Sequence, residues 1–414
     1  MIGIGKYKYE TTMKACFVGY IVQAIINNFI PLLFVNFQKV YSISLDKITL
    51  FITVNFTVQI IIDFVATIYV DKIGYRPSIV AAHIFSAAGL ISLTILPEII
   101  DPFAGILTSI CLYAIGGGLI EVLISPIMEA CPTKNKEKAM SLLHSFYCWG
   151  HVGVVFLSTL FFYFFGIDNW KILTLIYSAI PIFNAFIFLK TPIASLLSDG
   201  EEGMTLGELF KNKIFWMLVI IMLCAGASEL SVSQWSSLFA EKGLGLSKTM
   251  GDLAGPMFFA IMMGCSRVFY GKRGDTIDID KFTTYSSILC IVSYLLISLV
   301  PSPIINLLAC GTCGISVGIM WPGTFSKASA TLKTGGTAMF ALLALAGDLG
   351  CSAGPTLVGM ISDAYGENIK LGILVAILFP IGFIFTWKLL SKTKKKTEGS
   401  KVSEGTEITE TDVI

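Results

Sequence analysis

The sequence predicts an all-α membrane protein with twelve transmembrane helices in two six-helix bundles and both termini in the cytoplasm. Of its 414 residues 55% are hydrophobic and only 14% are charged, whereas a soluble domain carries about 25% charged residues. Apolar segments long enough to cross a bilayer recur along the chain, and basic residues gather in alternate loops. This composition excludes soluble enzymes and disordered proteins. The net charge of +1 gives no indication of a nucleic-acid partner.

Twelve segments have the length of about 20 apolar residues that a membrane-spanning helix needs. Those of the first half lie at 12–37, 45–70, 77–97, 103–129, 138–165 and 170–190. Those of the second half lie at 213–240, 246–271, 281–300, 303–326, 335–363 and 369–391. We therefore expect an N-terminal bundle over 1–190, a cytoplasmic central loop over 191–212, a C-terminal bundle over 213–391 and a disordered cytoplasmic tail over 392–414.

The distribution of the 29 lysines and arginines predicts the orientation. Most of them fall in alternate loops, such as the loop at 134–138, and in the two terminal segments. Because cytoplasmic loops carry the excess of basic residues, both termini are expected inside the cell. The protein is thus predicted to be a multi-pass protein of the cell membrane.

A short basic loop recurs at the same place in each half. Residues 70–77 read VDKIGYRP after the second span, and residues 270–275 read YGKRGD after the eighth. The first loop resembles the signature G-x-x-x-D-[RK]-x-G-[RK]-[RK] of the major facilitator superfamily, which is matched here by Asp71, Lys72, Gly74 and Arg76. We interpret these four residues as a gate in which Asp71 accepts from a helix amino terminus of the other bundle. The alternative is that the basic residues only hold the loop inside.

Three further stretches resemble the fucose permease-like group of proton-linked sugar symporters within that superfamily. They are residues 116–126, 229–235 and 347–363. The resemblance implies that Glu121 is the membrane acid through which transport is coupled to protons. The sugar permeases of this group also carry an acid on the first helix, where this chain has Gln23, Asn27 and Asn28.

Four ionisable residues inside the predicted spans are candidates for proton coupling: Glu121, Asp348, Glu229 and His151. An acid at the bilayer centre costs about 2.5–3.5 kcal/mol, so such residues are functional by default. Asp348 and His151 occupy equivalent positions in the eleventh and fifth spans, and the repeat would place them across a cavity. The alternative for each is a hydrogen-bonded helix crossing. Asp63 fits an interdomain latch at least as well as coupling, and Arg267 is expected to pair with an acid or a helix end.

Polar residues recur at helical spacing on the first two spans, which indicates a wet cavity or a hydrogen-bonded seam. Amides suit a hydroxyl-rich solute because they offer both donors and acceptors. Trp235 and Trp321 would stack on a sugar ring, although tryptophan is equally typical of membrane interfaces. The predicted substrate-binding residues are Gln23, Asn27, Asn55, Gln59, Trp235 and Trp321.

These features predict a secondary active transporter that moves a sugar or polyol by proton-coupled alternating access. Two alternatives remain, a proton-driven exporter of an amphiphilic drug or metabolite and a non-transporting membrane sensor. The chain has no GxxxxGK[ST] phosphate loop and no nucleophile elbow, so neither an ATP-driven pump nor an enzyme is expected. The ten cysteines predict buried thiols, and no metal or cofactor is expected. The expected partners are a small-molecule substrate, protons and the lipid bilayer, with no nucleic acid, and the protein is expected to be a monomer.

Overall fold

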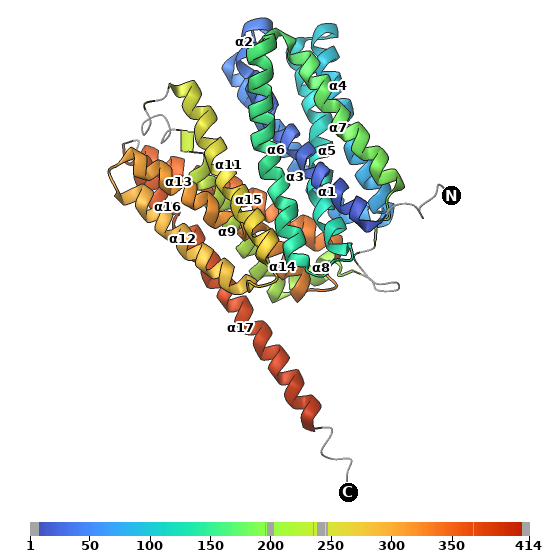
Figure 1. Cartoon of the computed structure of the whole chain (residues 1–414), viewed down its shortest axis with the longest axis vertical. Helices are drawn as coiled ribbons and strands as arrows, with labels where there is room; N and C mark the ends of the chain where they lie inside the picture. The colour runs from blue at the N-terminus through green and yellow to red at the C-terminus, as the bar shows by residue number, and fades with distance from the viewer. Residues whose placement is uncertain are drawn as a thin grey trace.

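Two bundles of long helices lie side by side in the computed structural model (Figure 1). It describes residues 8–194, 196, 203–234, 236–237, 245, 247–366 and 368–407, and none of these residues forms a β-strand. The bundles come together at the end that holds α8 and α14 and diverge towards the opposite end (Figure 1). We call the first end the paired end, because the turns at Gly74, at residues 131–135 and at Gly274 lie there in contact between the bundles.

The first bundle contains the helices of the first six predicted spans. They are α1 (Tyr9–Asn28), the 3₁₀ turn η2 (Ile30–Leu33), α2 (Phe34–Tyr41), α3 (Leu45–Ile73), α4 (Tyr75–Ile99), α5 (Pro102–Ala130), α6 (Lys136–Phe165), the 3₁₀ turn η3 (Ile167–Asn169) and α7 (Trp170–Lys190). Asp101 and Asn135 cap α5 and α6 by accepting from the amides of Ala104 and Lys138. Such caps satisfy amide groups that the first turn of a helix leaves unpaired.

The second bundle follows a short helix in the segment predicted as a loop. The short helix is α8 (Leu206–Lys211). The helices of the bundle are α9 (Lys213–Ser233), α11 (Lys248–Arg273), α12 (Ile279–Leu299), α13 (Pro303–Val317), α14 (Met320–Thr331), α15 (Gly336–Ala364), α16 (Ile369–Ala376) and α17 (Leu378–Glu407). A capping box at Thr205 and Glu208 starts α8.

Three of the predicted spans are broken just before a proline. The breaks after α1, α13 and α16 precede Pro31, Pro322 and Pro380. A proline ring clashes with the carbonyl four residues earlier and removes one helical hydrogen bond. The tenth and twelfth predicted spans are therefore each built from two helices.

The predicted fold class is confirmed. Eleven helical segments among the described residues are long and apolar enough to cross a membrane, and α11 occupies the place of the eighth predicted span. Large apolar side chains such as Phe183 and Phe385 face outward and are 68% and 69% exposed, as lipid contact requires. The domain boundaries and the orientation stay predictions.

The C-terminal end differs from the expected disordered tail. Helix α17 continues as far as Glu407 and projects away from the bundles (Figure 1). Adding residues to an existing helix costs much less than nucleating one, and the lysines and glutamates here are good helix formers. Residues 408–414 of the predicted tail lie outside the described residues.

Glycines bring α9 and α15 into backbone contact inside the second bundle. A Cβ added at Gly226 would lie 2.2 Å from the carbonyl oxygen of Gly347, and one added at Gly350 would lie 2.0 Å from the carbonyl oxygen of Leu223. Small residues are the usual means of close helix packing in membranes, where lipid supplies no hydrophobic drive between helices. This crossing determines the position of Asp348, which lies between Gly347 and Gly350 on α15.

We expect Gly350→Ala to destabilise the protein by about 1–3 kcal/mol, because the new methyl group would overlap backbone atoms of α9. Thermal unfolding in detergent would measure the effect. Gly359→Ala is the matched control on the same helix, since nothing lies within 4 Å of a Cβ added there. The control should be neutral or stabilising, because alanine favours a helix more than glycine does. Equal melting temperatures for the two variants would contradict this account of the crossing.

Candidate functional site

Four amide side chains of α1 and α3 form one hydrogen-bonded network with an acid of α5. Gln23 Nε2 donates to Gln59 Oε1 at 3.0 Å and to Glu121 Oε2 at 3.1 Å. Asn27 Oδ1 accepts from Gln59 Nε2 at 2.9 Å and from Asn55 Nδ2 at 3.3 Å. We call these five residues the amide network. It unites Gln23, Asn27, Asn55 and Gln59, the four amides predicted to bind substrate, with the acid Glu121.

The network is buried but not fully paired. Gln23 and Gln59 are each 2% exposed and Asn55 is 5% exposed. Gln23 Oε1 and Asn55 Oδ1 are buried acceptors without a donor among the described residues. Gly117 of α5 makes room for the network, because a Cβ there would lie 3.2 Å from Gln23 Oε1. The site therefore holds unused hydrogen-bonding capacity, which proteins seldom leave buried without a ligand or water.

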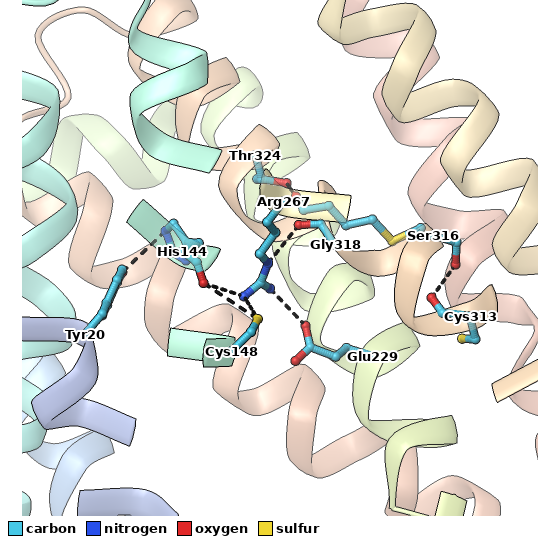
Figure 2. Close-up of polar contacts among 10 residues, drawn as sticks. Tyr20, His144, Cys148, Glu229, Arg267, Cys313, Ser316, Gly318 and Thr324 are labelled. Carbon is cyan, nitrogen blue, oxygen red and sulfur yellow. Dashed lines mark hydrogen bonds and ion pairs between the residues drawn. The ribbon is translucent and has the colours of Figure 1, made fainter. Parts of the chain in front are cut away.

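Arg267 of α11 joins the two bundles (Figure 2). Within its own bundle its Nε donates to the carbonyl oxygen of Gly318 at 2.9 Å, and its Nη2 lies 3.6 Å from Glu229 Oε2. Across to α6, its Nη1 donates to the carbonyl oxygen of His144 at 3.0 Å and to Cys148 Sγ at 3.1 Å. Arg267 is 3% exposed, and this set of partners distributes its charge over four groups. The expected pairing of Arg267 with an acid is present, and the acid is Glu229.

A second polar cluster lies beside Arg267 in the first bundle. Tyr20 OH is 2.9 Å from Ser125 Oγ, and His144 Nε2 is 3.4 Å from both of these oxygens. The His144 ring also faces Phe325 of α14, with a centroid separation of 5.8 Å, so the cluster touches the second bundle. Tyr147 of α6 lies beside Asn27 and Asn28 and links this region to the amide network.

The remaining predicted site residues lie in different surroundings. Asp348 is within hydrogen-bonding reach of Asp63 on α3. The Trp321 ring covers Gly347, where an added Cβ would lie 2.3 Å from it. His151 has no hydrogen bond to a described residue and no recorded contact with Asp348, so its coupling role stays a prediction. Trp235 lies outside the described residues.

The predicted gating loop meets the start of α15 at the paired end. Thr337 Oγ1 donates to Asp71 Oδ1 at 2.6 Å, and Tyr75 OH is hydrogen-bonded to the same threonine. Arg76 instead holds its own bundle together, since its Nη1 donates to the carbonyl oxygens of residues 188 and 189 at 2.7 and 2.9 Å. The Lys72 ammonium lies 5.7 Å from the Tyr69 ring centroid. Gly74 has φ of +94°, which the sharp turn between α3 and α4 requires.

Sequence reasoning missed a second set of contacts at the paired end, between α6 and α11. Lys138 forms an ion pair with Asp275, whose other oxygen accepts from Asn135 Nδ2 at 3.2 Å. The Lys138 ammonium holds the pKa of Asp275 below its usual range. Tyr270 OH donates to Glu137 Oε2 at 2.9 Å. These residues lie in or next to the turns before α6 and after α11, and their only signal in the sequence was the basic character of both turns.

A cavity of about 320 Å³ also lies at the paired end, away from the amide network. It is lined from the first bundle by Glu129 and Lys136 and from the second by Ser329, Lys333 and Phe340. Ser329 Oγ donates to Glu129 Oε1 at 2.8 Å across its wall. The cavity therefore lies among the contacts that hold the two bundles together at the paired end.

A double-mutant cycle on Arg267 and Glu229 would test whether the buried pair stabilises the fold. Removing one charge leaves the other buried without its partner, so we expect Arg267→Met or Glu229→Gln to cost about 3–5 kcal/mol of unfolding free energy. The double variant should be more stable than the sum of the single losses predicts. Lys171→Met is the control, because its ion pair with Glu98 is 37% and 51% exposed and should contribute little. Additive losses in thermal unfolding would contradict direct coupling.

Comparison with solved structures shows where this fold occurs. The structure of the transporter FucP in the outward conformation matches with a TM-score of 0.78 at 16% identity and covers 92% of this chain and 98% of that one. A double-tryptophan mutant of XylE matches with a TM-score of 0.81 at 12% identity, over 93% of this chain and 96% of that one. XylE, a proton:xylose symporter, bound to 6-bromo-6-deoxy-D-glucose gives a TM-score of 0.76 at 11% identity, over 92% and 95%. At these identities the likeness establishes the fold.

The sequence comparisons identify the family. The membrane protein MosC of Rhizobium meliloti is 23% identical over 276 residues, which make up 66% of this chain and 65% of MosC. The family model described as Major Facilitator Superfamily matches residues 15–355, which is most of the chain. With the two bundles, the membrane-spanning helices and the gating-loop motif, this match establishes that the chain is a multi-pass membrane transporter of the major facilitator superfamily.

Proposed function

We propose that the protein moves a small hydroxylated solute, a sugar or polyol, together with protons by alternating access. The observation that carries this proposal is the amide network and its two buried acceptors without donors, Gln23 Oε1 and Asn55 Oδ1. A hydroxyl group is both donor and acceptor, so a polyol would supply the missing donors. The likeness to FucP, the fucose:proton symporter of E. coli, and to XylE supports the same solute class.

Proton coupling would act through the hydrogen bond between Gln23 and Glu121. Gln23 Nε2 divides its donors between Gln59 and Glu121, so the solute-binding amides and the acid share one residue. A protonated Glu121 would accept more weakly and release Gln23 for the solute. No ion pair among the described residues includes Glu121. Asp348, Glu229 and His151 would take the further protonation steps.

The paired end would be the gate. Under the predicted orientation it faces the cytoplasm, so this structure corresponds to an outward-facing state. The solute would reach the amide network from the opposite end of the bundles. Reorientation would require the contacts of Asp71 with Thr337 and of Lys138 with Asp275 to separate while the bundles rock about the binding site.

Uptake by proteoliposomes tests the function and the role of Glu121. With labelled fucose, xylose and glucose as probes, we expect an inward proton gradient to drive accumulation of at least one of them. Glu121→Gln replaces the carboxyl with an amide, which cannot bind and release the proton. Gradient-driven accumulation should therefore fall by about 10²-fold or more, while counterflow exchange persists.

Glu10→Gln is the control for this experiment. Glu10 pairs with Lys14 on the exposed face of α1, with both side chains about 70% exposed, so its loss should leave uptake unchanged. If Glu121→Gln accumulates solute as well as the unmodified protein does, Glu121 is not the coupling acid. If none of the sugars is accumulated or exchanged, the proposed solute class is wrong.

The gate is tested separately by Thr337→Val, which keeps the side-chain shape but removes the donor to Asp71. We expect the paired end to open more often, by about 10–150-fold for the loss of a hydrogen bond to a charged group. Hydrogen–deuterium exchange at residues 71–76 and 336–340 would record the opening. Thr356→Val is the control on the same helix, because Thr356 is exposed and donates only to the carbonyl oxygen of Ser352. Equal hydrogen–deuterium exchange in both variants would contradict a gating role for the contact between Thr337 and Asp71.

A further inference from the structure

Three carboxyl groups of three different helices meet inside the interface between the bundles. Asp63 lies ten residues before the end of α3, Glu121 nine before the end of α5, and Asp348 twelve after the start of α15. At 1.5 Å per residue these positions are about 15, 14 and 18 Å from the paired end, so the three carboxyls lie at nearly the same depth. Asp63 and Asp348 belong to different bundles, and contact between them spans the interface.

Asp63 is the most enclosed of the three. Its residue is 0% exposed, and neither carboxylate oxygen receives a hydrogen bond from a donor among the described residues. The side chain that interacts with it from the other bundle is Asp348, also an acid. Two ionised carboxylates are both acceptors, so they form a hydrogen bond only when one of them carries a proton. One proton between α3 and α15 would therefore give these buried oxygens the donor that they lack.

No positively charged group among the described residues acts on Asp63 in place of that proton. The groups that act electrostatically on Asp63 are Asp348 from α15 and Glu121 from α5, both acids. From α4, His83 is already bonded to the carbonyl oxygen of Ile79 at 2.8 Å and to Asn184 at 2.8 Å. Ion pairs among the described residues include none of the three acids, and α1 contributes only the neutral amides of the network. Like charges this deep in a protein repel strongly.

We propose that Asp63 and Asp348 share one proton that holds the two bundles together at mid-depth, so that this arrangement forms with the proton bound and opens when the proton leaves to water. After release, both groups are carboxylates, and repulsion between them drives α3 from α15. This site deepens the proposed function, which already gives Asp348 a protonation step, because here the proton controls the closure of the bundles themselves and not the binding of a solute. It does not depend on which solute is carried or on Glu121 as the coupling acid.

Distance measurements between spin labels would test the proposal without any solute. Lys134→Cys in the loop between α5 and α6 and Lys272→Cys near the end of α11 place labels on the two bundles at the paired end, where both lysines are exposed. Cys265→Ser removes an exposed native thiol. The paired form binds one proton more than the open form, so the ratio of open to paired molecules should rise with pH. The expected slope is up to about tenfold per pH unit for one proton.

Removing the titrating proton should remove the slope. In Asp63→Asn, and separately in Asp348→Asn, the new amide donates permanently to the remaining carboxylate, so we expect the paired form to persist at every pH. Asp275→Asn is the matched control: it loses the ion pair with Lys138 at the paired end but leaves the carboxyl pair intact, and it should keep the slope. A wild-type ratio that does not change with pH, or an unchanged slope in both asparagine variants, would overturn the proposal.

Infrared spectroscopy with ¹³C-carboxyl-labelled aspartate reads the proton directly. We expect the band of a protonated aspartic acid in the folded protein at neutral pH, and its loss in Asp63→Asn and in Asp348→Asn, because one proton belongs to both groups. Absence of the band from the unmodified protein would also overturn the proposal. Glu121→Gln should keep both the band and the slope, which separates this proposal from the proposed function. Failure of proton-driven uptake with an intact slope would count against the proposed function alone.

Discussion

The structure depends on one constraint of the bilayer: a polar group at membrane depth must find its partner within the protein. Lipid offers no hydrogen bonds, so the amides of α1 and α3 turn towards α5 and bind one another and Glu121. Arg267 follows the same rule with four partners, two of them on the other bundle. The polar residues of the spans therefore gather where the bundles face each other.

These polar residues divide the interface between the bundles into two regions. Near the paired end it consists of ion pairs and hydrogen bonds between loops, such as those of Lys138 and Asp71. Deeper in, it consists of acids: Glu229 neutralised by Arg267, and Asp63 and Asp348 without a cation among the described residues. An interface of this kind responds to protonation because its stability depends on how many of these acids are charged. A transporter that alternates between two arrangements needs an interface that can separate.

The sequence predicted much of this arrangement, because hydropathy and helical spacing are local properties. Most of the predicted spans begin and end within a few residues of the helices, although the helix of the twelfth continues to Glu407. The periodic stripe of Gln23 and Asn27 on α1 faces that of Asn55 and Gln59 on α3, as amphipathic spacing requires. Asp71 in the loop motif accepts from Thr337 at the start of a helix of the other bundle, while its role in a gate stays a prediction.

What the sequence determined by itself is therefore the membrane class, the helices and the faces of those helices that are polar, all of which follow from residue type and spacing along one segment. Only the tertiary structure decided which polar groups meet. It paired Asp348 with Asp63 and not with His151, because the glycine-mediated crossing of α9 and α15 and the contact of α15 with α3 determine where that carboxyl lies. It also brought Arg267 to Glu229 and to α6. Contacts between bundles depend on how two packed bodies are oriented, and a property of the whole molecule leaves no periodic signal in any one stretch of chain.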